Sequence, residues 1–409
     1  MHILFLSHYY IPEVNAPASR VSEHCRAWAA AGHRVTVVTC APSHPAGKVY
    51  PGYRNRLFSR EFIDGVAVVR LWTFIAENKG FAKRTFGYLS YFLAASLAAP
   101  FLPRADVIVS TSPQFFCGLA GRMLRAVQRR PWALEIRDLW PESIVTVGAM
   151  RRGPGVRLLE ALEASAYRSA DAVVVVTDSF VDHVEARRGG RTGVHVVKNG
   201  VDLERFRPGA DAAAAKTRFG LTGKFVVAYV GTHGVAHGLD TALGAAALLQ
   251  GDTRIAFLFV GDGAERARLV ERARTLGLDN VHIVGQLPKD DMPAVWTATD
   301  ASLIPLKKSD TFTRVLPSKM FEAMAMQRPI LLGVEGEARA LLEESGGGIA
   351  IEPESPGALA AAVRRLADDP VLCASLGTRG GDFARRHFDR KALAARYLDL
   401  LETLAERGT

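Results

Sequence analysis

The chain has 409 residues, of which 48% are hydrophobic and 23% charged, so it is long enough for two or three globular domains. This composition, with 37 Gly and 20 Pro scattered along the chain, excludes collagen-like, coiled-coil, disordered and disulfide-stapled small proteins. The net charge is +9, and residues 1–200 carry all of the excess, with 25 Lys and Arg against 15 Asp and Glu. A basic half indicates either an anionic partner, such as nucleic acid or a membrane surface, or a contribution to solubility.

The four cysteines lie far apart and show neither CxxC nor Cys/His ligand spacing. This pattern predicts a reduced, cytoplasmic protein without a structural zinc. The first residues, MHILFLS, resemble a strand and lack the basic region, long apolar stretch and cleavage site of a secretion signal. We therefore do not expect export.

Short runs rich in Val, Ile and Phe alternate with segments of helical periodicity, which is typical of parallel sheets covered by helices on both faces. In the first half we expect strands at residues 3–7, 34–39, 66–70, 107–110, 133–136, 172–176 and 194–197, and helices near 18–31, 84–99, 115–128, 155–169 and 178–187. In the second half we expect strands at 225–230, 255–260, 281–284, 301–304, 330–332 and 348–351, and helices near 239–249, 263–276, 290–298, 317–326, 336–344, 355–367, 371–387 and 389–406.

A polar, loop-like segment, NGVDLERFRPGADAAAA at residues 199–215, separates the two alternating halves. We therefore expect an α/β protein with two doubly wound, Rossmann-like domains, residues 1–200 and 201–388. A C-terminal helix in residues 389–409 could pack back on the first domain. Ligands of such sheets bind beyond the carboxyl ends of the strands, so we expect the two domains to share one cleft.

Three glycine-bearing turns follow strands of the second half: VGTHGVAHG (230–238), VGDGAER (260–266) and VGQLP (284–288). Glycine lets backbone N–H groups approach an anion closely, although any one such turn could serve only to reverse the chain. Three in one domain favour a nucleotide site, and no complete Walker A, HExxH, GxSxG or cysteine metal motif competes with it. The candidate nucleotide-binding residues of these turns are Gly231, Thr232, His233, Gly261, Gly263, Gln286 and Leu287.

The most specific segment is RVLPSKMFEAMAMQRPILLGVEGEAR, residues 314–339. Pro317 and Ser318 are typical of a helix start, and Lys319 and Glu322 lie three residues apart, on one face of that helix. A cation in the first turn and a carboxylate one turn later could hold a diphosphate and two ribose hydroxyls. The alternative is an exposed Lys–Glu pair on the surface of the helix. The neighbouring glycine turns favour nucleotide binding, and we assign it to Ser318, Lys319 and Glu322.

These motifs, with KNGVD (198–202) and RDLWPES (137–143), resemble glycosyltransferase family 4, the retaining two-domain transferases of the GT-B fold. The likeness runs from Met1 to beyond Glu337. RDLWPES, PSKMFEAMA and LGVEGEAR resemble in particular the bacterial branch of proposed N-acetyl-L-fucosaminyltransferases of O-antigen and capsule assembly. The resemblance implies a UDP-sugar donor in the second domain, a polyprenyl pyrophosphate-linked saccharide acceptor at the first, and no nucleic-acid partner.

The second domain departs from the family pattern in its charged residues. Glu322 matches the second glutamate of the family's Glu-seven-residues-Glu motif, but Arg314 stands at the position of the first. The arginine and lysine that usually follow the first strand of this domain are missing, because GTHGVAHG offers only His233 and His237. Lys319, or a basic residue of the first domain, is therefore the expected diphosphate cation and a candidate catalytic residue.

The first domain departs at two places: Arg137 precedes Asp138 where many relatives have a histidine, and Asn15-Ala16 stands where a Gly-Gly pair is common. No Asp-x-Asp occurs in the sequence, so we expect no metal cofactor and assign the leaving charge to backbone N–H groups and cations. The resemblance implies front-face substitution, in which the departing phosphate helps to remove the acceptor's proton. Arg137, Asp138 and Glu142 are candidates for orienting the sugars, and a structural Arg–Asp pair is the alternative.

Residues 86–102, FGYLSYFLAASLAAPFL, contain no charge and are flanked by Lys79, Lys83 and Arg84 before and Arg104 after. The segment is short for spanning a hydrocarbon core of about 30 Å. A buried helix and a helix lying on an anionic bilayer are the two remaining interpretations. With the basic first half, this segment predicts peripheral association with the cytoplasmic face of the cell membrane.

Two other functions fit the same architecture. A UDP-sugar 2-epimerase would need acid/base carboxylates on both sides of the sugar and no acceptor. A noncatalytic, membrane-associated scaffold of polysaccharide assembly would bind UDP without turnover. The main hypothesis is a retaining glycosyltransferase that moves a sugar, such as an N-acetylated deoxysugar, from UDP to a lipid-linked saccharide.

Overall fold

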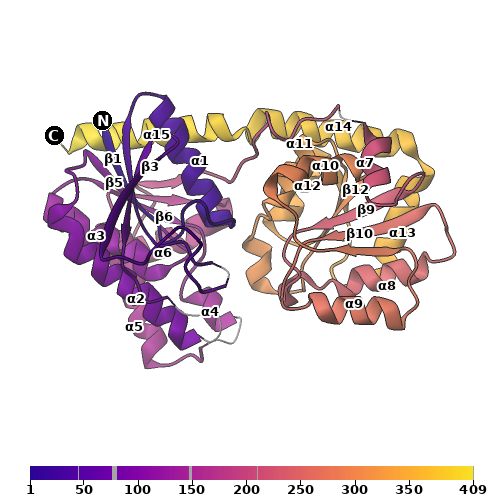
Figure 1. The fold of residues 1–409 in the computed structure, drawn as a ribbon, viewed down its shortest axis with the longest axis horizontal. Coiled ribbons are helices and arrows are strands. Elements are labelled where there is room, and N and C mark those ends of the chain that lie inside the picture. The colour runs from indigo at the N-terminus through magenta and orange to yellow at the C-terminus, as the bar shows by residue number, and fades with distance from the viewer. Residues whose placement is uncertain (45, 76–80, 147–149, 210, 409) are drawn as a thin grey trace. The chain divides into compact units, whose positions relative to one another are not determined.

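A computed structural model describes all residues except 45, 76–80, 147–149, 210 and 409. It divides the chain into two compact units, one of Met1–Asn199 with Lys391–Thr409 and one of Gly200–Arg390 (Figure 1). Each unit is a twisted sheet covered by helices on both faces, so both have the expected Rossmann-like α/β organisation.

The sheet of the N-terminal unit has the strand order β3-β4-β2-β1-β5-β6-β7-β8. Every pairing is parallel except that of β3 with β4, which is antiparallel. Its strands are β1 (His2–Leu6), β2 (Arg34–Cys40), β3 (Phe58–Ile63), β4 (Val66–Leu71), β5 (Val107–Thr111), β6 (Trp132–Ile136), β7 (Ala172–Val175) and β8 (Val194–Val196). Its helices are α1 (Ala16–Ala30), α2 (Phe81–Ala98), α3 (Phe115–Gln128), α4 (Glu142–Thr146), α5 (Pro154–Ser169), α6 (Val181–Arg188) and α15 (Arg390–Arg407).

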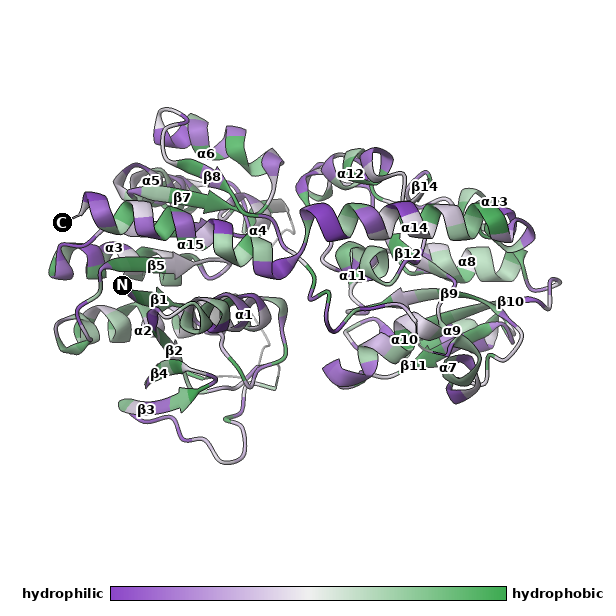
Figure 2. Cartoon of the chain, turned by 90° about the horizontal axis from the view of Figure 1, so that it is seen from above, coloured by the Kyte–Doolittle hydropathy of each residue, from purple (hydrophilic) through white to green (hydrophobic). Residues whose placement is uncertain are grey.

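Alternation along the buried strands gives this sheet two apolar faces. Ile3 and Phe5 of β1 pack with α1 and α15, whereas Leu4 and Leu6 pack with α2, α3, α5 and α6. Because successive strand residues point to opposite faces, a continuous apolar run such as HILFL supplies both cores. Figure 2 shows these strands mainly in green, and α15 with alternating hydrophilic and hydrophobic turns.

Strand β3 and the short helix α4 were not predicted from the sequence. The sequence of β3, FSREFI, alternates between exposed and half-buried positions at the sheet edge. The prediction relied on short continuous apolar runs, which identify strands covered on both faces and miss an edge strand of this kind.

The C-terminal unit has the order β11-β10-β9-β12-β13-β14, with all neighbours parallel. The chain order therefore reverses between β9 and β12, which is the switch point where doubly wound sheets bind ligands. The strands are β9 (Phe225–Val230), β10 (Ile255–Val260), β11 (Val281–Val284), β12 (Ala301–Pro305), β13 (Ile330–Gly333) and β14 (Gly348–Ala350). The helices are α7 (Ala212–Arg218), α8 (Asp240–Leu248), α9 (Arg266–Thr275), α10 (Met292–Ala298), α11 (Lys319–Ala325), α12 (Glu337–Ser345), α13 (Pro356–Asp368) and α14 (Pro370–His387).

The expectation that residues 199–215 form a loop-like separator was wrong in part. Val201 and Phe206 are buried in the core of the C-terminal unit, and α7 begins within the segment. The Asp211 side chain caps α7 by accepting hydrogen bonds from Ala213 N and Ala214 N. Composition alone resembled a linker because the two buried side chains are isolated among polar residues.

The last helix, α15, belongs to the N-terminal unit. Trp28 Nε1 donates to the carbonyl of Ala394 at 2.9 Å. Tyr397 and Leu401 are fully buried in the same core as Trp28. The helix therefore completes one face of the N-terminal sheet.

Candidate functional site

The switch point of the C-terminal sheet is lined by the loop that follows β9. Gly231 N donates to Val260 O and His233 N to Asp262 O, both at 2.9 Å, so this loop lies against the one after β10. On its other side, Lys307 N, just beyond β12, donates to Ala236 O at 2.9 Å. The loop containing Thr232 and His233 is thus fixed between two strand ends.

Glycine at 261 and 263 is required by this packing. A Cβ at Gly261 would lie 1.9 Å from Gly231 O, and one at Gly263 would lie 2.4 Å from His233 O. Both residues also have positive φ, of 147° and 157°. These two glycines bring backbones of adjacent loops together, so their observed role is structural, and the contact with nucleotide assigned to them stays a prediction.

Lys319 lies at the start of α11 with its ammonium turned inward. Its Nζ is buried without a hydrogen-bond partner in the described chain, although part of the stem is exposed. Nζ lies 3.8 Å from the centroid of the Tyr229 ring, and it would lie 3.1 Å from a Cβ atom placed on Gly231. Burial lowers the pKa of Lys319 to about 7, although the negative charge of Glu322 acts to raise it. The alternative of an exposed surface pair was therefore wrong.

Two histidines surround the same tyrosine ring. The ring centroids of His233 and His237 lie 5.9 and 5.7 Å from that of Tyr229. Both nitrogens of His233 and Nδ1 of His237 are buried without partners among the described residues. Burial lowers both pKa values, that of His237 to about 3, with a further contribution from the charge of Lys319. This cluster of side chains thus has unused donors and acceptors among the described residues and a cation that titrates near neutrality.

Glu322 lies one turn along α11. Its Oε2 accepts from Trp296 Nε1 at 3.1 Å, which fixes the carboxylate beside α10. Ser318 is the N-cap residue of α11, so the predicted helix start is confirmed, although its exposed side chain makes no capping hydrogen bond with the described residues. Gln286 and Leu287 lie after the edge strand β11, where Gln286 is exposed and Leu287 packs on the core.

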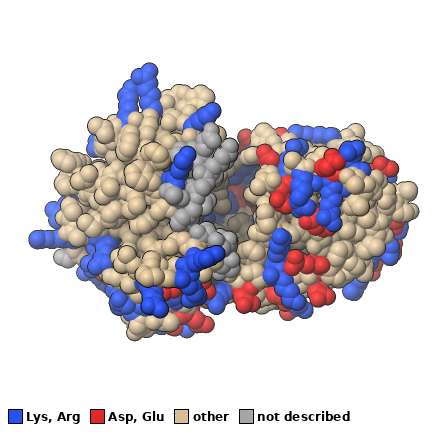
Figure 3. Space-filling model, turned by 90° about the horizontal axis from the view of Figure 1, so that it is seen from below, with Lys and Arg blue, Asp and Glu red and all other residues tan. Residues whose placement is uncertain are grey.

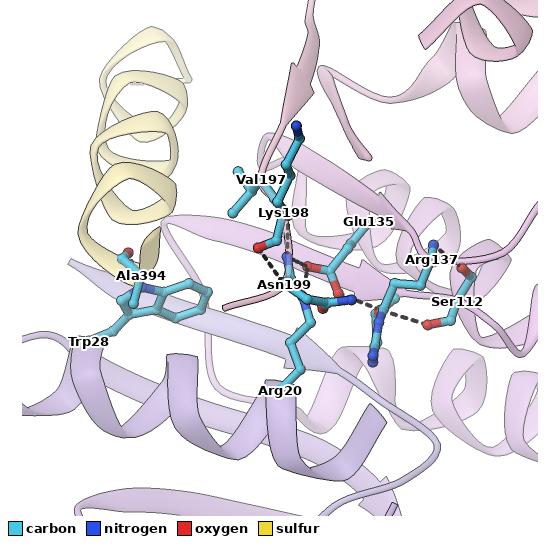
Figure 4. A network of polar contacts seen from close by, with 10 residues as sticks. Arg20, Trp28, Ser112, Glu135, Arg137, Val197, Lys198, Asn199 and Ala394 are labelled. Atoms are coloured by element: carbon cyan, nitrogen blue, oxygen red, sulfur yellow. Dashed lines mark hydrogen bonds and ion pairs between the residues drawn. The ribbon is translucent and has the colours of Figure 1, made fainter. Parts of the chain in front are cut away.

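The N-terminal unit holds a buried ionic network at the carboxyl end of β6 (Figure 4). Arg20 donates to Glu135 Oε2 from Nε at 3.1 Å and from Nη2 at 3.0 Å. It also donates to Val197 O, Lys198 O and the Asn199 side chain at 2.9 to 3.1 Å. Burial raises the pKa of Glu135, but the charges of Arg20 and Arg137 outweigh burial and hold it below its usual value. The network ties three successive residues at the unit's end to one central strand.

Arg137 and Asp138 follow β6 directly. Arg137 N donates to Ser112 Oγ at 2.7 Å, while its Nε and Nη1 are buried and unpartnered in the described chain. Burial lowers the pKa of Arg137 to about 10. Asp138 accepts from Ser143 Oγ at 3.2 Å, and burial raises its pKa. Within the described residues the two form no ion pair, so the alternative of a structural Arg–Asp pair was wrong.

Glu142, predicted to orient a sugar, has a structural partner. Its Oε2 lies 3.2 Å from His183 Nδ1, and His183 Nε2 lies 3.0 Å from Glu163 Oε1. Arg187 Nε pairs with Glu163 at 2.8 Å. Glu142 is therefore part of an ionic chain between α4, α5 and α6.

Sequence reasoning missed four residues of these two sites. Tyr229 and Trp296 are in apolar runs and were counted as core, which they also are. Arg266 begins α9, and its charge contributes to the lowered pKa of His233. Arg20 was missed because its partner Glu135 lies 115 residues away. A glutamate inside the apolar strand WALEI was the one available signal, since a buried carboxylate requires a partner.

No group of three or more His, Cys, Asp or Glu that could hold a metal ion is found in the described part of the chain. Independence from metal stays a prediction.

Two family models match the chain. Residues 15–200 match the glycosyl transferase 4-like domain and residues 224–369 match glycosyl transferases group 1. WcaI of Escherichia coli (strain K12), named as a colanic acid biosynthesis glycosyl transferase, is 27% identical over 412 residues, covering 98% of this chain and 99% of that protein.

Two solved structures share the fold along the whole chain. Sucrose-phosphate synthase from Thermosynechococcus elongatus gives a TM-score of 0.79 at 21% identity and covers 98% of both chains. Anabaena Alr3699/HepE in complex with UDP-glucose gives 0.71 at 17% identity, covering 99% of this chain and 100% of that one. At these identities the likeness concerns the fold.

Two Rossmann-like units that match structures of the GT-B fold, together with the two glycosyl transferase models, identify the protein as a glycosyltransferase of that fold. The two matching models between them span most of the sequence, so the similarity to glycosyl transferases extends through both units of this enzyme. The N-acetyl-L-fucosaminyltransferase branch stays a prediction.

Proposed function

We propose that this enzyme is a retaining glycosyltransferase that moves a sugar from a UDP donor to a lipid-linked saccharide during surface polysaccharide synthesis. The observation that carries the proposal is the buried ammonium of Lys319 at the β9–β12 switch point, which lies over the Tyr229 ring and has no hydrogen-bond partner among the described residues. A buried cation without a hydrogen-bonded counter-charge is costly, and a diphosphate beside it would supply that charge. The similarity to WcaI supports polysaccharide synthesis, and the fold shared with Alr3699/HepE supports UDP as the nucleotide.

The donor's parts can be assigned to residues of the C-terminal unit. The diphosphate would lie against Lys319 and the backbone of Thr232, and the ribose hydroxyls against Glu322. The expected role of Gly231 as a backbone donor was wrong, because its N–H already donates to Val260 O. Protonated Lys319 would stabilise charge that develops on the departing phosphate, and that phosphate would take the acceptor's proton in a front-face substitution. No metal is needed in this scheme, because protein groups meet the leaving charge.

The N-terminal unit would hold the acceptor. Arg137, with two unpartnered buried nitrogens, is placed to bind an anionic or hydroxyl-rich group beyond β6, and Asp138 lies beside it. We assign the polyprenyl pyrophosphate-linked saccharide to this side and no nucleic acid to either unit.

The direct test is a panel of UDP-, GDP- and dTDP-sugars, assayed for binding and for transfer to short polyprenyl pyrophosphate saccharides. We expect transfer from a UDP-sugar with retention of the anomeric configuration, with and without EDTA. Epimerisation of donor in the absence of acceptor would identify a 2-epimerase. UDP binding without transfer to any lipid acceptor would identify a scaffold.

Replacing Glu322 with glutamine should weaken UDP binding about 10- to 100-fold, because a charge-assisted contact to the ribose is worth about 1.5–3 kcal/mol. Glutamine keeps an acceptor for Trp296 Nε1, so the fold should be retained. Calorimetry with UDP and with 2′-deoxy-UDP measures the effect at the hydroxyl itself.

In the wild type the deoxy analogue should bind more weakly than UDP, and in Glu322→Gln the two should bind almost equally. If the variant discriminates between them as well as the wild type does, Glu322 does not contact the ribose.

Helix α2 supports the proposal of membrane association, with a correction to the residues involved. If the whole of residues 86–102 met a bilayer, Tyr91 would face lipid, but Tyr91 is fully buried and its hydroxyl donates to Val38 O at 2.7 Å. Phe86, Leu93, Leu97 and Phe101 are 57–78% exposed. Phe101 lies in the short 3-10 helix Ala99–Phe101 that follows α2, and we call these four residues together the apolar face of α2.

Charge and shape around this face fit an anionic bilayer. Lys83 and Arg104 are exposed near its two ends, while Lys79 lies outside the described residues. Figure 3 shows the N-terminal unit with a broad uncharged area, and the charged side chains around it are mostly Lys and Arg with few acidic ones. No helix of the described residues combines the length and apolarity needed to cross a bilayer. We therefore propose that the enzyme lies on the cytoplasmic face of the membrane.

Replacing Phe86, Leu97 and Phe101 with serine should lower salt-resistant binding to anionic vesicles about a hundredfold, because partial insertion of each side chain contributes about 1 kcal/mol. Flotation at low and high salt measures this, since salt screens only the contribution of Lys and Arg. UDP affinity should not change.

The matched control replaces Leu248, Leu276 and Val371, equally exposed apolar residues of the C-terminal unit, with serine. This variant should float like the wild type. Equal flotation of the α2 variant and this control would contradict the proposal.

A further inference from the structure

A polar cavity lies in the N-terminal unit, away from the residues discussed so far. It has a volume of about 580 Å³ and lies between the end of α3, the starts of β6 and β7, and the end of α15. Four arginines line it: Arg125, Arg129, Arg130 and Arg407. We call it the arginine pocket.

The charge of this pocket is not balanced from within. Asp171 is the only acidic side chain among the described residues that line it, and both of its oxygens accept hydrogen bonds from Arg125, at 2.9 and 3.0 Å. Asp171 Oδ2 also accepts from Trp132 N. Within the described chain, Arg129, Arg130 and Arg407 form no ion pair, and Nε of Arg130 is buried without a partner.

The backbone accounts for this convergence of charge. Arg129 ends α3 in a left-handed conformation, with φ of 53°, and Pro131 then fixes the entry into β6. Two successive arginines are therefore presented at a chain reversal, where α15 adds Arg407. Three like charges on rigid elements repel one another unless an anion neutralises them.

The pocket lies at the amino ends of the strands, whereas the candidate acceptor residues lie at the carboxyl end of β6. Arg130 and Pro131 precede β6, whereas Arg137 follows it, and a five-residue strand spans about 16 Å. None of the candidate donor or acceptor residues lines the cavity. A ligand here would be separate from the transfer reaction.

We propose that the arginine pocket is a binding site for a pair of adjacent phosphate groups. Arginine forks bind phosphate oxygens bidentately, and three uncompensated guanidinium groups match the charge of a diphosphate. The cavity has the volume of a small-molecule site. The same chemistry is offered by a free diphosphate and by a lipid headgroup with two phosphates.

The test uses inorganic pyrophosphate and the full-length chain saturated with UDP, so that the donor site is occupied. Calorimetry should detect pyrophosphate binding that UDP does not displace. Arg129→Ala with Arg130→Ala should weaken it at least about a hundredfold, because the double variant loses two charge-assisted contacts. Arg130→Lys should weaken it less, because it keeps the charge and loses the fork.

The matched control is Arg122→Ala with Arg157→Ala, which removes two exposed arginines of the same unit that do not line the pocket. It should bind pyrophosphate like the wild type. Equal weakening in both double variants, or binding wholly displaced by UDP, would overturn the proposal. Because UDP binding is measured separately, failure of the donor assignment would be recognised independently.

Vesicles distinguish the two sources of phosphate. Each cardiolipin molecule carries two phosphates, and each phosphatidylglycerol molecule carries one. Vesicles of the two lipids are prepared with the same total charge. A preference for cardiolipin that the Arg129/Arg130 variant loses would identify a lipid headgroup. Pyrophosphate binding without that preference would identify a soluble diphosphate, and absence of both would overturn the site.

Discussion

Replacing Lys319 with methionine should lower turnover about 10²- to 10³-fold, which is the usual effect of removing one group that stabilises developing negative charge. Turnover should fall more than UDP affinity, because the charge on the leaving diphosphate is greatest in the transition state. Lys224→Met is the matched control. Lys224 is a lysine of the same unit before β9, at the opposite edge of the sheet, and its loss should leave turnover unchanged.

The pH dependence gives a second, independent signature. With a pKa of about 7 in the unliganded protein, Lys319 is mostly neutral at pH 8, and a diphosphate favours the protonated form. UDP affinity should therefore fall between pH 7 and 9, by as much as tenfold per unit, and binding at pH 8 should take up a proton. Lys319→Arg, which stays charged, should abolish both effects. Calorimetry in buffers of different ionisation enthalpy measures the proton.

Stability should change in the opposite direction to activity. The folded pKa of Lys319 lies below its ordinary value of 10.5, so the unfolded chain holds the extra proton between about pH 7 and 10.5. Wild-type stability relative to Lys319→Met should therefore rise across that window, and the variant should be the more stable at or below pH 7. A variant with unchanged turnover and an unchanged pH profile would show that Lys319 is not the diphosphate cation.

Replacing Arg20 with alanine should destabilise the N-terminal unit by about 3–5 kcal/mol, because it leaves the buried carboxylate of Glu135 without its main partner. It also removes the hydrogen bonds to Val197 O and Lys198 O. Urea denaturation followed by a probe in the N-terminal unit measures the loss. Replacing both Arg20 and Glu135 with leucine should cost less than the single change, since no unpaired charge remains.

The control for this prediction lies on the same helix. Arg26 pairs with Asp64 at 3.5 Å, and both side chains are about half exposed. Arg26→Ala should cost less than about 1 kcal/mol. Equal losses from Arg20→Ala and Arg26→Ala would show that burial does not strengthen the Arg20–Glu135 pair.

Sequence alone determined the architecture of both units and brought together several residues of the candidate nucleotide site. Buried parallel strands such as VVAYV and FLFV are continuous apolar runs, and the glycine turns mark where they end, so strands and loops could be located without coordinates. Lys319 and Glu322 could be placed together because three residues on a helix bring two side chains to one face. Each of these features depends on residues that are close together in the sequence, so it could be recognised without knowing the tertiary structure.

Tertiary structure decided which side chains are shielded from water and which residues distant in sequence meet. It placed the ammonium of Lys319 over the ring of Tyr229 and brought Glu142 into contact with His183. It also buried Tyr91 and left Phe86 exposed. It also joined Arg20 to Glu135 and brought Arg407 to the end of α3. Burial and long-range pairing depend on how helices pack on the sheet, and that packing is set by the whole chain. Both the pKa of Lys319 and the charge of the arginine pocket arise from it.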